Sequence, residues 1–198
     1  LESGVFERVI VSTDDEEIAA IALAEGAEVP FLRPIEISDD HAGTDEVMAH
    51  ALRVLAVQGF VPAEACCIYA TAPWVRATDI RAGQVLLRQG WDYAFSATSY
   101  AHPVFRAFIA EPDDGGAQML MPEHYHTRSQ DLPEAFHDAA QFYWGTREAW
   151  LEGRMLFGRR SAIVRLPRWR VQDIDTPEDW RRAEVLYRVL QEMTDDEA

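Results

Sequence analysis

The sequence contains no lysine, so arginine supplies all 18 of its basic side chains. Against 34 aspartates and glutamates, these leave a formal net charge of −16 at pH 7. Proteins that bind nucleic-acid duplexes neutralise phosphates with a basic face, so this composition argues against a nucleic-acid partner. Any anionic ligand would have to be bound by a few local groups.

The chain also lacks an apolar run long enough to span a bilayer, and it lacks a signal-peptide pattern. We therefore expect a soluble, cytoplasmic protein with no membrane partner. The two cysteines, Cys66 and Cys67, are adjacent within an apolar run. Adjacent cysteines are poorly placed for a structural disulfide, so we expect free, buried thiols in a reducing compartment.

Strand-like and helix-like segments alternate along the first half of the chain. Short apolar or β-branched runs predict strands, and these lie at residues 8–12, 28–32, 65–70 and 91–98. Apolar positions at helical spacing predict helices between them, at residues 16–26, 44–55 and 77–89, with Thr44 able to cap the second. The run 65–70 is typical of a central strand in a parallel sheet. The alternation predicts an α/β fold with a doubly wound, mostly parallel, Rossmann-like sheet that binds ligands at the carboxyl ends of its strands.

The alternation fails between residues 99 and 143. With 198 residues in all, we expect a single domain over 1–198 in which 99–143 is an insertion. The insertion carries aromatic residues, four of the six histidines, and Arg106 and Arg128, a mixture found in ligand pockets and subunit contacts. Because it has too few periodic apolar positions to fold on itself, it predicts a homodimer.

Near the carboxyl terminus, Asp173 and Asp175 flank Ile174 directly before a helix signal. In an extended segment side chains at i and i+2 leave the same face, so the two aspartates should point together, about 7 Å apart, with Ile174 pointing inward. Thr176 would then cap the helix, and Pro177 would occupy its first position. Two converging carboxylates are typical of a Mg²⁺ site completed by substrate phosphates, but an acidic helix cap has the same pattern, and spacing alone does not separate them.

The helix that follows should run to about residue 192. Its apolar residues recur at the spacing of one buried face, and they are Trp180, Ala183, Leu186, Tyr187 and Leu190.

Six motifs in this order resemble those of the acylneuraminate cytidylyltransferases, which make CMP-activated nine-carbon acidic sugars. They span nearly the whole chain: FERVIVSTD at 6–14, FLRP at 31–34, IYATAP at 68–73, HP at 102–103, FHDAAQFYW at 136–144 and DID at 173–175. The YA and QFYW sequences within them favour the pseudaminate branch of the family. The resemblance implies transfer of CMP from CTP to pseudaminic acid with release of pyrophosphate.

The resemblance also implies which residues carry the reaction. Asp173 and Asp175 would be catalytic and would hold Mg²⁺. The nucleotide would be bound by Arg33, Ala42, Thr44 and Thr71, with Arg33 near the cytosine. The sugar would be bound by Tyr69, Arg106, Arg128, Gln141 and Tyr143, the arginines pairing with its carboxylate.

Members of the family begin with a strand and a loop containing Ala-Arg-Gly-Gly-Ser-Lys, which supplies N–H donors and a cation to the CTP phosphates. That loop does not occur in residues 1–198, so we expect efficient catalysis only from a chain that carries it. Two alternatives remain at this point. The acceptor could be a sialic or legionaminic acid, or the chain could bind nucleotide sugars without catalysis.

Overall fold

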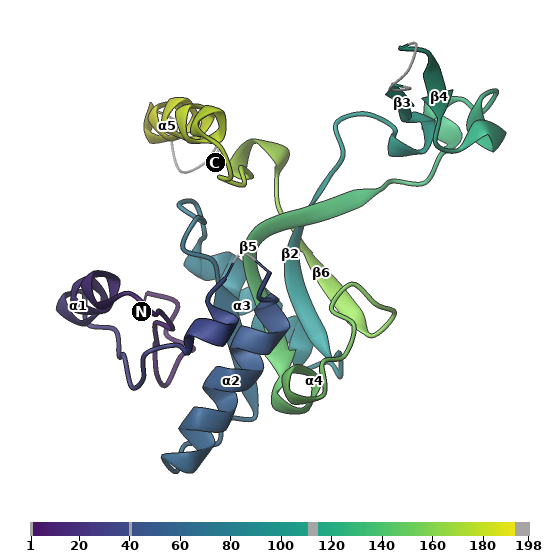
Figure 1. Ribbon diagram of the computed structural model, residues 1–198. Helices are drawn as coiled ribbons and strands as arrows, with labels where there is room; N and C mark the ends of the chain where they lie inside the picture. Colours follow the sequence, from purple (N-terminus) through teal and green to yellow (C-terminus); the bar gives the residue numbers. More distant parts are fainter. Residues whose placement is uncertain (1, 40, 111–114, 193–198) are drawn as a thin grey trace. The chain divides into compact units, whose positions relative to one another are not determined.

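The computed structural model describes residues 2–39, 41–110 and 115–192 (Figure 1). The chain divides into two compact units: Leu1–Phe95 with Gln141–Val164, and Ser96–Ala140 with Arg165–Ala198. The expected insertion limits, 99 and 143, lie within a few residues of the unit boundaries at 96 and 140.

The first unit contains four α-helices within the described residues: α1 (Glu16–Ala24), α2 (Thr44–Val57), α3 (Ala77–Leu87) and α4 (Arg147–Glu152). A 3-10 turn, η1 (Ile35–Ile37), precedes α2. The three helices predicted from apolar periodicity are thus present, each ending within about two residues of its expected limit, because helix signals are local.

A four-stranded sheet has the order β1-β5-β2-β6, formed by β1 (Glu64–Ile68), β2 (Tyr93–Ser99), β5 (Phe136–Thr146) and β6 (Ser161–Arg165). β1 pairs antiparallel with β5, in a register that sets Cys66 opposite Trp144. β2 and β6 run parallel, since Asp92 N donates to Arg160 O and Leu166 N donates to Ala97 O. The α/β class is therefore confirmed, with a mixed sheet carrying helices.

Two strand predictions need correction. The run 65–70 forms β1, which is an edge strand of the described sheet and not a central one. A continuous apolar run indicates that both faces of a strand are covered, but it does not indicate how many strands lie beside it. Segments 8–12 and 28–32 do not form strands of the sheet and meet through one parallel bridge, Ile10 to Glu28.

The core of the first unit forms where α3 packs on β5. Trp144 and Phe142 of β5 are buried, and Trp144 Nε1 donates to Ile80 O at 2.9 Å. Gly83 allows this close approach, since a Cβ there would lie 2.6 Å from Trp144 Cδ1 and 2.9 Å from Phe142 Cε2. Burying such large side chains contributes about 1.5–3 kcal/mol each, which fixes the path of β5 in this unit.

The adjacent cysteines of β1 are free thiols, as expected, but their residues are half-buried and not fully buried. Burial raises the pKa of the Cys67 thiol to about 12 and that of Cys66 well above its usual value. Both are therefore protonated at neutral pH and are weak nucleophiles.

The second unit contains a two-stranded hairpin of β3 (Phe108–Ala110) and β4 (Ala117–Met119), and the helix α5 (Pro177–Glu192). Short 3-10 turns complete it: η2 (Val104–Arg106), η3 (Pro122–His124), η4 (Ser129–Asp131) and η5 (Arg168–Arg170).

Helix α5 begins at Pro177 as expected, but its buried face is narrower than predicted. Ala183 is buried, whereas Trp180 is 59% exposed and Tyr187 is 52% exposed. The Trp180 indole N–H donates to Glu184 Oε1 at 3.3 Å along the helix surface. The spacing of apolar residues shows which side chains share a face of a helix, but how much of that face is buried depends on the element that packs against it.

Within the residues the structure describes, no helix is both long enough and apolar enough to cross a membrane.

Candidate active site

Arg33 is held by acceptors from two separate segments of the first unit. Its Nε donates to Ser38 Oγ at 3.0 Å, Nη2 to Asp14 Oδ1 at 3.4 Å and Nη1 to Ser12 O at 3.5 Å. The Arg33 backbone N–H donates to Thr13 O at 2.8 Å. The side chain is half-buried, so burial and these hydrogen bonds together hold the guanidinium group in one orientation.

Thr44 is the first residue of α2, and its hydroxyl is not the helix cap that we expected. The N-cap is Gly43, which offers no side chain, while Thr44 Oγ1 lies 2.6 Å from Tyr69 Oη. Ala42, just before the helix, donates its N–H to Asp39 O at 3.3 Å. The predicted nucleotide residue Thr44 and the predicted sugar residue Tyr69 are therefore direct partners.

Thr71 lies exposed in the turn that follows β1. This turn is closed by Ala72 N, which donates to Tyr69 O at 3.2 Å. Thr71 and Tyr69 thus lie at the carboxyl end of β1, the position where α/β folds bind ligands.

Gln141 and Tyr143 lie on β5 and are almost fully buried, at 2% and 1% exposed. The Tyr143 ring is 5.0 Å from the Tyr69 ring, and Gln141 O accepts a hydrogen bond from Tyr69 N at 3.1 Å. Phe142 and Trp144, which alternate with them along the strand, are equally buried. Burial therefore does not distinguish side chains that could contact a ligand from side chains of the core. The reason is that β5 has a neighbouring strand on each side and covered faces.

In the second unit Asp173 and Asp175 are exposed and Ile174 is half-buried, as the alternation predicted. Partial screening of the carboxyl from water, and then the charge of Asp175, raise the pKa of Asp173, with a further contribution from Asp138. Within the described residues, neither Asp173 nor Asp175 takes part in an ion pair.

Sequence reasoning did not include Asp138 in this acidic cluster. Its carboxylate accepts a hydrogen bond from Ala140 N at 2.9 Å, where Ala140 has a φ of 50°, unusual for a residue with a side chain. The sequence did single out Asp138 as part of the motif at 136–144. Its position near Asp173 could not be predicted, because the two residues are about 35 positions apart in sequence.

The cap of α5 is made by Thr176 and Asp179. Thr176 N donates to Asp179 Oδ2 at 3.0 Å, and Asp179 N donates to Thr176 Oγ1 at 3.2 Å. This reciprocal pair is a capping box. The Thr176 hydroxyl also donates to the Asp179 carboxylate and so lowers the pKa of Asp179. The helix therefore has its cap without the side chains of Asp173 and Asp175.

The two predicted sugar-binding arginines differ in their surroundings. Arg128 is 70% exposed and forms a two-point ion pair with Asp131, from Nε to Oδ2 at 2.7 Å and from Nη2 to Oδ1 at 3.1 Å. Arg106 is exposed at the end of η2. A carboxylate ligand at Arg128 would have to compete with Asp131, which already accepts two hydrogen bonds from the Arg128 guanidinium.

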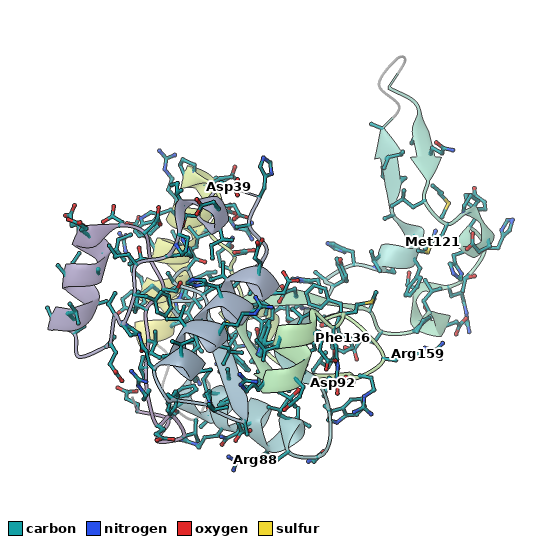
Figure 2. All side chains as sticks on the ribbon, turned by 60° about the horizontal axis from the view of Figure 1, so that its bottom comes forward. Asp39, Arg88, Asp92, Met121, Phe136 and Arg159 are labelled. Atoms are coloured by element: carbon teal, nitrogen blue, oxygen red, sulfur yellow. The ribbon has the colours of Figure 1, made fainter. Side chains whose placement is uncertain are left out.

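The first unit also contains a cavity of about 340 Å³. Apolar side chains of α2 and Phe6 form much of its wall, and Glu64 and Cys66 of β1 line one side. At its rim the Glu64 carboxylate accepts hydrogen bonds from Gln84 at 3.1 Å and from Arg88 at 3.0 Å, and Figure 2 shows Arg88 at the surface. None of the predicted site residues lines this cavity, so we do not assign the chemistry to it.

The fold is that of an α/β nucleotidyltransferase. It is shared by a solved structure of CMP:2-keto-3-deoxy-manno-octonic acid synthetase complexed with CTP, with a TM-score of 0.60 and 14% identity over 96% of this chain and 83% of that one. The 4-diphosphocytidyl-2C-methyl-D-erythritol synthase of Anaerococcus prevotii is similar at a TM-score of 0.59 and 13% identity, over 94% and 84% of the two chains.

Sequence comparison gives the family. Residues 1–105 match a family model described as cytidylyltransferase. The chain is 40% identical over 193 residues to the pseudaminic acid cytidylyltransferase of Campylobacter jejuni, covering 97% of this chain and 83% of that protein. It is 29% identical over 185 residues to N-acylneuraminate cytidylyltransferase A of Danio rerio, covering 93% and 42%. The chain therefore belongs to the cytidylyltransferase family, and the resemblance noted in its sequence motifs is confirmed.

Proposed function

We propose that this protein is a Mg²⁺-dependent cytoplasmic enzyme that transfers CMP from CTP to pseudaminic acid. The observation that carries the proposal is the 40% identity over 97% of the chain to a protein of that activity. The relatives named for N-acylneuraminate are less similar, at 29% and 26% identity. Free thiols at Cys66 and Cys67 suit a reducing compartment.

In the proposed reaction the anomeric hydroxyl oxygen of the sugar attacks the α-phosphorus of CTP. A phosphorus–oxygen bond to the sugar forms, the bond to the β-phosphate bridging oxygen breaks, and pyrophosphate leaves with its electron pair. The hydroxyl proton is lost to solvent or to a base. Such transfers depend mainly on positioning and on neutralising the phosphate charge.

Asp173 and Asp175 suit a hard divalent cation. They carry two carboxylates with no ion-pair partner in the described chain, and the α5 cap does not use them. Partial burial, and then the charge of Asp175, raises the pKa of Asp173. No group of three or more acidic, histidine or cysteine side chains within the described residues is arranged for a metal, but Mg²⁺ needs only one or two carboxylates when phosphates complete its shell. When bound, Mg²⁺ would offset negative charge on the phosphates.

The other assignments follow the chemistry of each side chain. Arg33, fixed by Ser38 and Asp14, would bind the nucleotide together with Ala42, Thr44 and Thr71. Arg128 and Arg106 would bind the sugar carboxylate, since guanidinium matches a planar anion in two-point geometry. Gln141 and Tyr143 would become accessible to the sugar only after movement of the side chains that now cover them.

We further propose a homodimer formed through residues 99–143. The hairpin β3–β4 and the residues that follow it, up to Tyr125, expose apolar side chains, and a cluster of exposed apolar side chains is unfavourable in water. They are Phe108 at 68%, Tyr125 at 63%, Leu120 at 56%, Ile109 at 48% and Met121 at 36%, the last labelled in Figure 2. Light scattering at micromolar concentration should give twice the chain mass of 22.4 kDa, and a monodisperse monomer would contradict this.

The proposal is tested with the full chain encoded by the gene. It is incubated with CTP, MgCl2 and, in separate reactions, purified pseudaminic, sialic and legionaminic acids, and both pyrophosphate and CMP-sugar are measured. We expect the highest kcat/KM with pseudaminic acid and no product when EDTA removes the metal. A higher kcat/KM with another sugar would change the substrate. Binding of CTP and sugar without product would favour the non-catalytic alternative.

A further inference from the structure

The hydrogen bond between Thr44 and Tyr69 joins two elements at the proposed site. It connects the first residue of α2 with the residue directly after β1, 25 positions apart, and its 2.6 Å length is near the ordinary value for two hydroxyls. Both side chains are half-buried. This bond therefore fixes the start of α2 against the end of β1.

Tyr69 is itself held from the other side by β5. Its backbone N–H donates to Gln141 O at 3.1 Å, and its ring lies 5.0 Å from that of Tyr143 with an angle of 52° between the ring planes. Tyr143 in turn is almost fully buried against Phe95. The Tyr69 hydroxyl is thus a fixed point to which Thr44 is attached.

We infer that Tyr69 is a positioning residue for the nucleotide, acting through Thr44, and not a group that binds the sugar. This rests on the proposed function, in which Thr44 contacts CTP. The N-cap of α2 is Gly43, which provides no side-chain cap. The Thr44 side chain therefore supplies the hydroxyl group in the first turn of this helix. The orientation of that hydroxyl follows from the hydrogen bond to Tyr69.

The chemistry of two hydroxyls gives the inference a direction. A phenol is the stronger acid and the better donor, so the Tyr69 O–H donates to Thr44 Oγ1 and leaves the Thr44 O–H to donate elsewhere. Thr44 therefore meets an acceptor atom of the nucleotide, such as a carbonyl, ribose or phosphate oxygen. Without the Tyr69 hydroxyl the Thr44 side chain can rotate to other staggered positions, and part of its contribution to binding is lost.

Tyr69→Phe is the direct test, because it removes the hydroxyl and keeps the ring against Tyr143. CTP binding is measured by calorimetry without sugar, and KM for each substrate by pyrophosphate release in the full chain. We expect the CTP dissociation constant and the CTP KM to rise on the order of tenfold, the range expected for one hydrogen bond. The sugar KM should stay within about twofold. Tyr187→Phe, a half-exposed tyrosine of α5 outside the proposed site and outside residues 99–143, is the matched control and should change neither.

Thr44→Val and the double variant complete a cycle. If Tyr69 acts through Thr44, the double variant binds CTP no more weakly than Thr44→Val alone, and Thr44→Ser behaves like wild type. Additive losses, a rise in the sugar KM alone, or unchanged CTP binding in Tyr69→Phe would each overturn the inference. If wild type binds CTP but forms no CMP-sugar, the proposed function fails while the binding cycle still decides this inference. If wild type does not bind CTP, both are wrong.

Discussion

Two regions of this molecule place aspartates in opposite surroundings. Asp92, just before β2 and labelled in Figure 2, accepts hydrogen bonds from Arg160 Nη2 at 3.1 Å and lies 3.2 Å from Arg154 Nη1. Asp173, in the turn before α5, has Asp175, Asp138 and Asp179 as charged neighbours. The Arg160 hydrogen bond lowers the pKa of Asp92, whereas partial burial and Asp175 raise that of Asp173.

The difference separates a carboxylate whose charge is offset by arginines from one whose charged neighbours are other carboxylates. Asp92 is only 8% exposed and has its positive partners within its own unit. Asp173 and Asp175 have no ion-pair partner in the described chain, which is consistent with the proposed Mg²⁺ site. Titratable groups with raised pKa values in like-charge clusters are frequent at functional sites, which agrees with the proposed role of this turn.

The largest effect is expected for Asp175→Asn. Asparagine preserves the shape of the side chain, and the α5 cap is made by Thr176 and Asp179, so the melting temperature should stay within about 2 °C of wild type. Loss of a metal carboxylate should lower Mg²⁺-dependent turnover on the order of a hundredfold or more. Pyrophosphate release measures the turnover and thermal melting the fold. Turnover within about threefold of wild type would mean that the turn is not the metal site.

The next largest effect is expected for Arg128→Ala. Its partner Asp131 is intermediate between Asp92 and Asp173, because it is exposed but paired with an arginine. If the guanidinium binds the sugar carboxylate, the sugar KM should rise on the order of tenfold with an unchanged CTP KM. Steady-state kinetics with each substrate varied would show this.

Asp131→Asn is the matched control. It frees Arg128 from its neighbour without removing it, so the sugar KM should stay equal or fall. Equal losses for both substrates in Arg128→Ala would assign the arginine a structural role.

A smaller effect, on stability, is expected for Asp92→Asn. Since the folded pKa of Asp92 is lowered from 3.8, its contribution is present above that value and is lost as the pH falls through the folded pKa. Its arginines are 40% and 68% exposed, so solvent screens the pairs and the contribution at pH 7 should be on the order of 1 kcal/mol.

Melting temperatures between pH 3 and pH 7 test this. Asp92→Asn should melt about 2–4 °C below wild type at pH 7, with the gap closing as the pH falls below about 3.8. A gap that is constant with pH would show that the carboxylate charge does not matter.

The smallest effect has the opposite sign. A folded pKa of Asp173 above its usual value means that the ionised carboxylate opposes folding at neutral pH, and that this cost is absent below about pH 3.8. Metal-free Asp173→Asn should therefore melt slightly above wild type at pH 7, by on the order of 1 °C, and equal to it at low pH. A lower melting temperature at pH 7 would remove the contrast with Asp92.

Much of the fold followed from local patterns in the sequence. Helices α2 and α3, strand β2 and the start of α5 at Pro177 are set by apolar spacing and by turn residues within about ten positions of one another. The Asp173 and Asp175 pair was likewise visible, since the i, i+2 spacing on either side of Ile174 is a local property.

The tertiary structure decided what depends on distant segments. It placed β1 at the edge of the described sheet, where its neighbour is β5, an antiparallel strand that begins about 70 residues later in the sequence. It brought Asp138 near Asp173 and attached Thr44 to Tyr69. Spacing along a chain fixes which side chains share a face of one element, but which elements meet depends on the packing of the whole core, and no short window of sequence contains that information.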